Sequence, residues 1–312
     1  MAEGWLDFEQ PLAQFVERLD ELTAIGAKEE VAKVADQIEK LKVKLYANLT
    51  PWQRVLLARH PRRPYTLDYV ARIATDFVEL HGDRVFGDDA ALVAGLGRID
   101  DLRCAIIGHQ KGRDTREKLA RNFGMPHPEG YRKALRVMEL AERFGLAVVC
   151  LVDTPGAYPG VGAEERGQAE AIARNLRAMA MLTVPVVVVV TGEGGSGGAL
   201  AIAVGNRVLM QENAVYSVIS PEGCASILWR DNDRAEEAAK VMRMTARELA
   251  EFGVIDGVVP EPLGGAHQDW DEAAQLLKTA VLAHCRELAT LSPNELVAQR
   301  VARFAAIGAY GD

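Results

Sequence analysis

Cysteine is scarce in this chain, and its placement excludes two kinds of structural site. The 312 residues include four cysteines, at positions 104, 150, 224 and 285. No two of them form a C-x-x-C pair, so we expect no structural zinc site here. Their wide spacing gives no indication of a disulfide framework. Cys104 and Cys150 lie in apolar, strand-like runs, where a small core side chain is the expected role.

Long apolar runs and excess positive charge are also missing. No stretch approaches the ~20 apolar residues that a membrane helix needs. The N-terminal segment MAEGWLDFEQPL lacks the basic and apolar regions of a secretory signal. Lysine and arginine number 36 against 44 acidic residues, and the net charge of −8 argues against nucleic acid as the main partner. A cytoplasmic enzyme or enzyme subunit without a membrane contact is expected.

Glycine is concentrated in one stretch, residues 186–203, with the sequence VVVVVTGEGGSGGALAIA. The five valines predict a strand that is buried on both faces. Five glycines then surround Ser196, and a small, apolar, helix-compatible segment follows from Ala199. A strand that ends in glycines and leads into a helix directs free backbone N–H groups to one place, where the helix dipole favours negative charge. The stretch is therefore predicted to bind an anion.

The rest of the chain predicts an α/β architecture. Residues 8–48 have narrow apolar stripes with a break near Gly26, typical of a helical hairpin that packs on a second subunit or on its own domain. Further helices are predicted at 50–60, 67–80, 128–144, 164–182, 235–244, 245–252, 270–290 and 293–307, and further strands at 91–99, 103–108, 146–152, 206–211, 214–219 and 254–259. Two strand–glycine loop–helix units lie about 38 residues apart, a loose internal repeat that gathers loops on one side of a sheet.

Two basic segments stand out in this acidic chain. His60, Arg62 and Arg63 lie among prolines, which predicts an exposed, stiff loop. Residues 109–121 contain five basic side chains against two acidic ones. This second segment either meets phosphates or an acidic carrier protein, or it is a salt-bridged helix surface. The candidate contacts in it are Lys111, Arg113, Arg116 and Lys118.

Three interpretations of the glycine stretch compete. A phosphate loop requires Lys-Ser or Lys-Thr after its last glycine, but Ala199 and Leu200 follow here, and the dinucleotide fingerprint does not fit either. A serine hydrolase is the second interpretation, because residues 194–198 match Gly-x-Ser-x-Gly between a strand and a helix. Asp256 and His267 follow in the chain order that such a triad requires.

The third interpretation is an oxyanion hole made of backbone N–H groups. Glycine is needed there because a side chain would block the approach of a thioester or urea-like carbonyl to the main chain. Each such donor stabilises a transition state by about 3 kcal/mol. In this case Ser196 is only a small residue that fits, or a hydroxyl that supports the loop.

Several long motifs resemble one known family, the alpha subunits of bacterial acetyl-coenzyme A carboxylase carboxyltransferase. They are LDFEQP at 6–11, ARHPRRPYTLDY at 58–69, GHQKGRDTREK at 108–118, RNFGMPHPEGYRKALR at 121–136, DTPGAYPGVGAEERGQAEAIARNL at 153–176, GEGGSGGALAI at 192–202, YSVISPEGCASILW at 216–229 and EPLGGAH at 261–267. The segment around 26–36 is shorter than in some members.

The resemblance implies a crotonase (ClpP/crotonase-type) fold, a superhelix of β-β-α units. With it we expect an N-terminal helical arm that contacts a subunit at 1–50, a carboxyltransferase core at 51–265 and C-terminal helices at 266–312. The family forms a heterotetramer of two alpha and two beta subunits, and zinc is expected only in the beta subunit. Biotin carboxyl carrier protein and biotin carboxylase complete the larger complex, where ATP binding belongs to another subunit.

The family reaction transfers a carboxyl group from carboxybiotin on the carrier to acetyl-coenzyme A. The product is malonyl-coenzyme A, at the first committed step of fatty acid biosynthesis. The resemblance assigns the backbone N–H groups of Gly197 and Gly198 to the oxyanion of biotin, with Gly198 and Ala199 as the other possible pair. Contacts with biotin are further expected from Gly156, Ala157, Gly195, Ser196 and Ala199, and no metal ligand is expected in this chain.

Overall fold

One mixed β-sheet forms the centre of the molecule in this computed structural model, which describes residues 4–308. Its strand order is β1-β2-β3-β4-β5-β6-β8, and β7 pairs with the end of β5. The first three strands are antiparallel, and pairing is parallel from β3 onward. The strands are β1 Thr75–Glu79, β2 Leu92–Ile99, β3 Leu102–His109, β4 Ala147–Thr154, β5 Val186–Gly195, β6 Arg207–Gln211, β7 Val215–Ser217 and β8 Gly257–Val259.

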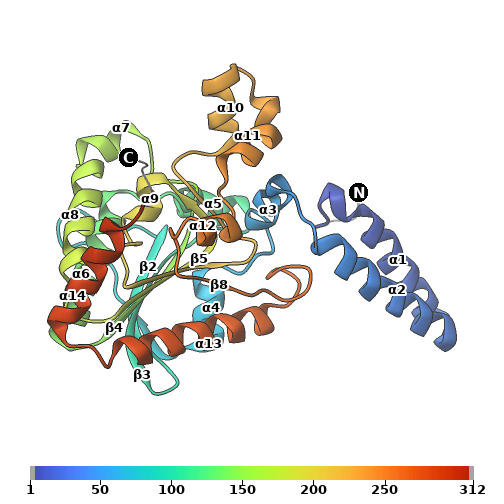
Figure 1. Cartoon of the computed structure of the whole chain (residues 1–312), viewed down its shortest axis with the longest axis horizontal. Helices are drawn as coiled ribbons and strands as arrows, with labels where there is room; N and C mark the ends of the chain where they lie inside the picture. Colours follow the sequence, from blue (N-terminus) through green and yellow to red (C-terminus); the bar gives the residue numbers. More distant parts are fainter. Residues whose placement is uncertain (1–3, 309–312) are drawn as a thin grey trace.

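Helices cover both faces of this sheet (Figure 1). One apolar cluster joins the sheet to α6 (Pro128–Arg143) and α8 (Gln168–Met181). A second cluster on the other face contains residues of α4 (Thr66–Ile73) and α13 (Trp270–Leu288). Burial on both faces explains why β4 and β5 are almost continuously apolar. Cys104 and Cys150 are buried free thiols within these clusters, as predicted.

The remaining helices lie around this core. They are η1 Asp7–Glu9, α3 Pro51–Ala58, α5 Thr115–Ala120, η2 Asn122–Gly124, α7 Val161–Glu165, α9 Ser196–Leu200, α10 Pro221–Trp229, η3 Asn232–Arg234, α11 Ala235–Met242, α12 Ala246–Glu251 and α14 Pro293–Ala305. Figure 1 shows that α10 and α11 extend from the body as a pair. No helix in the described range 4–308 is long and apolar enough to cross a membrane.

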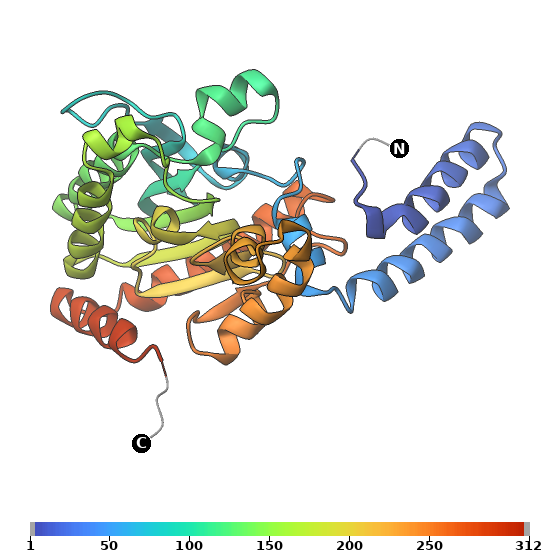
Figure 2. The same cartoon turned by 90° about the horizontal axis from the view of Figure 1, so that it is seen from above.

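The N-terminal hairpin has the predicted form. Its helices are α1 (Gln10–Ala24) and α2 (Lys28–Tyr46), and the chain reverses at Gly26, whose φ of +75° suits glycine. The two apolar stripes meet each other through buried Leu12, Val34 and Ile38. Figures 1 and 2 show the hairpin extending away from the sheet.

The prediction of a helix at 67–80 is wrong for the second half of this range. The helix α4 ends at Ile73, and β1 follows as an edge strand paired with β2. Phe77 decides the outcome, because its ring lies against Gly95 and Gly97 of β2, where a Cβ would come within 2.6 Å and 3.3 Å of Phe77 atoms. This cross-strand contact overrides the local helical periodicity.

Two smaller boundaries also differ from the predictions. The helix predicted at 164–182 is divided into α7 and α8 by Gly167, whose φ of +81° interrupts regular helix. The last strand is shorter than the predicted 254–259, because β8 begins only at Gly257.

Candidate active site

The glycine loop, residues 192–198, lies where β5 meets α9. The strand runs through Gly195, and the helix begins at Ser196, three positions earlier than the predicted Ala199. The glycine end of β5 pairs with β7, with Gly194 opposite Tyr216. A Cβ on Gly194 would come within 2.6 Å of the Tyr216 ring, so glycine is required for this pairing.

The glycine loop touches the β4 loop, residues 155–160, through backbone atoms. A Cβ on Gly195 would overlap the Pro155 carbonyl, and one on Gly198 would overlap the backbone of Gly156 and Ala157. Gly197 differs, because the nearest atom to its Cβ position is Ile172 Cδ1 at 3.7 Å. The structure brings Gly156, Ala157, Gly195 and Gly198 together and leaves no space for a side chain at Gly195 or Gly198. Their contact with biotin stays a prediction.

The serine-hydrolase arrangement is not assembled. Asp256 accepts hydrogen bonds from Val208 N and Arg303 Nε, each at 2.7 Å. His267 stacks on His60 with a centroid distance of 4.0 Å. Within residues 4–308, no hydrogen bond joins Ser196 to either of them. Ser196 itself has a φ of +49°, a conformation that its motif alone did not reveal.

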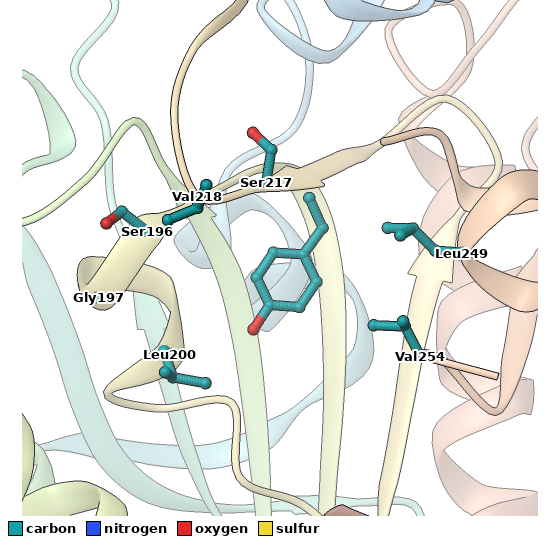
Figure 3. A pocket seen from close by; sticks show the side chains of 8 residues that line it. Ser196, Gly197, Leu200, Ser217, Val218, Leu249 and Val254 are labelled. Carbon is teal, nitrogen blue, oxygen red and sulfur yellow. The ribbon is translucent and has the colours of Figure 1, made fainter. Parts of the chain in front are cut away.

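An apolar cavity opens beside the start of α9 (Figure 3). Its volume is about 280 Å³, comparable to the lower end of small-molecule pockets. The lining residues are Ser196, Gly197, Leu200, Tyr216, Ser217, Val218, Leu249 and Val254. Burial raises the pKa of the Tyr216 phenol to about 12, so its hydroxyl stays protonated at neutral pH.

A buried ionic cluster lies below the two loops, and sequence reasoning missed most of it. Lys111 Nζ lies 2.6 Å from Asp153 Oδ1 and 2.9 Å from Glu193 Oε2. Burial alone would raise the pKa of Glu193, but the charges of Lys111 and Arg59 and their hydrogen bonds hold it at about 2. Both carboxylates are nearly inaccessible, with side chains 2% and 12% exposed. The position of Glu193 inside the glycine stretch is the sequence feature that could have indicated its place in the site.

Arg59 extends this cluster to the surface. Its guanidinium contacts Glu193 Oε1 at 2.7 Å and Glu222 Oε1 at 2.5 Å. Arg59 follows α3, and Glu222 lies in the first turn of α10. The cluster therefore links the glycine loop to the extending α10–α11 pair.

The loop at 60–64 is exposed, as predicted, only at Pro61 and Arg62. Arg63 is fully buried and pairs with Glu261 at 2.5 Å, with further bonds to Thr191 O and Gln211 Oε1. His60 is also buried. The prediction failed for Arg63 because the carboxylate that neutralises it lies 198 residues later in the chain.

The basic segment at 109–121 divides into an inner and an outer part. Lys111 belongs to the buried cluster, and Arg113 pairs with Asp68 and stacks on Tyr65 and Trp270 at 4.4 Å and 4.6 Å. Arg116 and Lys118 are exposed on α5, and neither forms an ion pair with the described part of the chain. Whether these four residues contact coenzyme A or a carrier stays a prediction.

One side-chain group has the composition of a metal site. Ligand atoms of Glu9, His60 and His267 lie within 4.8 Å of one another. Both nitrogens of His60 are already hydrogen-bonded, with Gly4 O at 3.0 Å and Arg62 N at 3.1 Å. The two rings are stacked rather than directed at a common point. The group is better described as a contact between the N-terminal segment and the core.

Comparisons with known proteins identify the family of this chain. A family model described as acetyl co-enzyme A carboxylase carboxyltransferase-like matches residues 5–308. The acetyl-coenzyme A carboxylase carboxyl transferase subunit alpha of Azoarcus sp. (strain BH72) is 57% identical, over 99% of this chain and 98% of its own length. The corresponding subunit of Halorhodospira halophila is 56% identical, over 99% of both chains.

Solved structures of more distant sequence share the fold. Transcarboxylase 12S superposes with a TM-score of 0.60 at 22% identity, over 73% of this chain and 42% of that chain. A Pseudomonas malonate decarboxylase hetero-tetramer in complex with coenzyme A superposes with a TM-score of 0.61 at 17% identity, over 77% and 95%. The crotonase-type fold implied by the sequence motifs is thereby confirmed. The chain belongs to the family of acetyl-coenzyme A carboxylase carboxyltransferase alpha subunits.

Proposed function

We propose that the glycine loop binds the negative charge that forms on biotin during carboxyl transfer, with the N–H groups of Gly197 and Gly198 as donors. The observation that carries this proposal is the close backbone contact between Gly198 and the β4 loop. Residues 197 and 198 are the second and third of α9, where backbone N–H groups have no partner within the helix. The N–H group of Ala199, one position further along, is used in the first hydrogen bond within the helix. The N–H groups of residues 197 and 198 are therefore the favoured pair of donors.

Members of this family catalyse biotin-dependent carboxyl transfer, with the carboxyl group brought as carboxybiotin. Cleavage of the N–CO₂ bond releases carbon dioxide and leaves its electron pair on the ureido group of biotin. The N–H groups of Gly197 and Gly198 stabilise the ureido oxygen as this charge develops. The basic ureido nitrogen takes a proton from the methyl group of acetyl-coenzyme A. The resulting enolate carbon bonds to carbon dioxide, which gives malonyl-coenzyme A and regenerates biotin.

The surroundings of the two donors support this role. Gly156 and Ala157 of the β4 loop lie against Gly198. The contact of Gly195 with Pro155 sets the distance between the β4 loop and the glycine loop. Ala199 is fully buried beneath the loop. The cavity beside Ser196 and Gly197 offers apolar space next to the donors (Figure 3). No side-chain base is required, since the substrate itself carries the base.

As an alpha subunit of this family, the chain works with a beta subunit. We further infer, from the family resemblance, a cytoplasmic heterotetramer of two alpha and two beta subunits, with zinc only in the beta subunit. The biotin carboxyl carrier protein and biotin carboxylase are the other inferred partners. Arg116 and Lys118 are the exposed positions from which this chain would meet an acidic carrier or coenzyme A phosphates.

The Ser196→Ala variant separates the oxyanion proposal from a serine nucleophile. In the complex assembled with the beta subunit, we expect malonyl-coenzyme A formation to stay within about threefold of the wild type, because the hydroxyl has no catalytic partner. The isolated chain is expected to be inactive. A loss of about 1000-fold or more, together with labelling of wild-type Ser196 by a fluorophosphonate, would overturn the proposal.

A further inference from the structure

Lys111 occupies a junction between three strands of the sheet. It follows the end of β3 by two residues and reaches both Asp153 at the end of β4 and Glu193 in the glycine end of β5. Its methylene stem lies over Gly124, where a Cβ would come within 2.6 Å of Lys111 Cγ. The side chain is only 14% exposed, so its position is fixed by packing as well as by charge.

The two carboxylates that Lys111 contacts lie at the starts of the β4 loop and the glycine loop. Asp153 directly precedes Thr154 and the β4 loop, and its Oδ1 accepts a hydrogen bond from Glu193 N at 2.9 Å. Gly192 lies against the same carboxylate, with no room for a Cβ. One ammonium group thus holds the start of the β4 loop and the start of the glycine loop at a fixed separation.

Removing this ammonium would leave like charges close together in a buried place. Glu193 would then keep Arg59, which also neutralises Glu222. Asp153 would keep the charge of Arg63, which is already paired with Glu261. Burial by itself would lower the pKa of Lys111, but the charges of Asp153 and Glu193 outweigh it and raise the pKa above the usual value. The ammonium is therefore permanently charged and already paired, which disfavours its use as a contact for phosphate.

We propose that Lys111 is a positioning residue for carboxyl transfer, which fixes the β4 loop against the glycine loop without touching either substrate. This inference depends on the proposed function of the glycine loop. It also replaces the initial prediction for this one residue, in which Lys111 meets coenzyme A or the carrier. A shift of about 1 Å in the oxyanion donors is enough to cost on the order of 100-fold in rate.

The test compares Lys111→Met with Lys278→Met in the assembled complex with the beta subunit. Lys278 is a matched control, because it forms a 2.6 Å ion pair with Asp100, is 22% exposed and lies in α13 against the turn between β2 and β3. We expect Lys111→Met to lower kcat by about 100-fold, with the KM values for acetyl-coenzyme A and carboxybiotin within about threefold of wild type. Lys278→Met should retain wild-type kinetics.

Two further readouts distinguish positioning from general destabilisation. Lys111→Arg keeps the charge and should recover kcat to within about tenfold of wild type. Glu193 faces Lys111, Arg59 and Asp153, and loss of Lys111 raises the pKa of Glu193 from about 2 toward or beyond its ordinary value. Protonation of Glu193 removes the repulsion between the two carboxylates, so the ratio of variant to wild-type kcat should rise as pH is lowered from about 8 to about 6. If the Lys111→Met subunit does not assemble with the beta subunit, the kinetics of Lys111→Arg and Asp153→Asn are compared with those of Lys278→Met instead.

The outcomes separate this inference from the proposed function. One contrary result is a rise in KM of about tenfold or more at unchanged kcat, with the difference from wild type disappearing at high salt. It would show that Lys111 binds a phosphate or the carrier, and it would overturn the inference. Equal losses in Lys111→Met and Lys278→Met would overturn it as well. Neither result affects the glycine loop proposal, which is tested by Ser196→Ala and by removal of the N–H group of Gly198.

Discussion

The loops after β4 and β5 leave neighbouring parallel strands at the same edge of the sheet, yet they use glycine differently. In the glycine loop, Gly195 and Gly198 have no room for a Cβ because the partner backbone occupies that space. In the β4 loop, Gly156 has open space around its Cβ position. Its place is set instead by Thr154, whose Oγ1 donates to Gly156 O at 2.7 Å and accepts from Gly156 N at 3.1 Å.

This difference shows which loop shapes the site. The glycine loop is fixed by close backbone contact and by the strand pairing with β7. The β4 loop is held mainly by hydrogen bonds, between Thr154 and Gly156 at its start and between Tyr158 and both Pro126 O and Gln168 Nε2 further along. Substitutions in the glycine loop should therefore have larger effects than substitutions that loosen the β4 loop.

Gly198→Ala should have the largest effect. The added methyl group overlaps the backbone of Gly156 and Ala157, which cannot move aside like the end of a flexible side chain. We expect malonyl-coenzyme A formation by the assembled complex to fall by about 100-fold or more. The free energy of unfolding of the subunit should fall by about 1–3 kcal/mol.

Gly197→Ala is the matched control for stability. Its methyl group would lie 3.7 Å from Ile172, an ordinary contact. Its free energy of unfolding should stay within about 1 kcal/mol of wild type. If both variants unfold at the same denaturant concentration, the contact between the loops does not constrain Gly198 as described.

Thr154→Val should have a smaller effect, confined to the β4 loop. Valine keeps the shape of the fully buried side chain but leaves Gly156 N and O without this partner. We expect a loss of about 1–3 kcal/mol in the free energy of unfolding and about tenfold in kcat.

The exposed Thr279 in α13 serves as its control, because Thr279 Oγ1 donates to Gln275 O within its own helix. Thr279→Val should change stability by at most about 0.5 kcal/mol. Equal effects of the two threonine substitutions on kcat would show that the β4 loop is not held through Thr154.

Local sequence patterns predicted the parts of the fold that local physics determines. The valine run, the glycine break and the hairpin reversal at Gly26 each depend on residues next to one another. The helix–strand change at Ile73 was missed, because the contact of Phe77 with Gly95 and Gly97 exists only once β1 and β2 pair.

The candidate site shows the same limit. The sequence singled out the glycines and the basic segment, but it placed Lys111 on a surface. The partners of Lys111 lie on β4 and β5, and Glu193 is 82 residues further along the chain. Arg63 was assigned to an exposed loop for the same reason, since Glu261 neutralises it from a distant segment. Buried ion pairs between distant segments cannot be found from spacing in a single sequence.

We propose that backbone N–H groups, and not a side chain, stabilise the charge on biotin. An amide-to-ester exchange at residue 198, with glycolic acid in place of Gly198, removes one N–H group and adds no Cβ. In the complex with the beta subunit, we expect a loss of about 100- to 1000-fold in kcat for malonyl-coenzyme A formation, with the melting temperature nearly unchanged. Wild-type kcat in a folded complex that carries the ester would contradict the proposal.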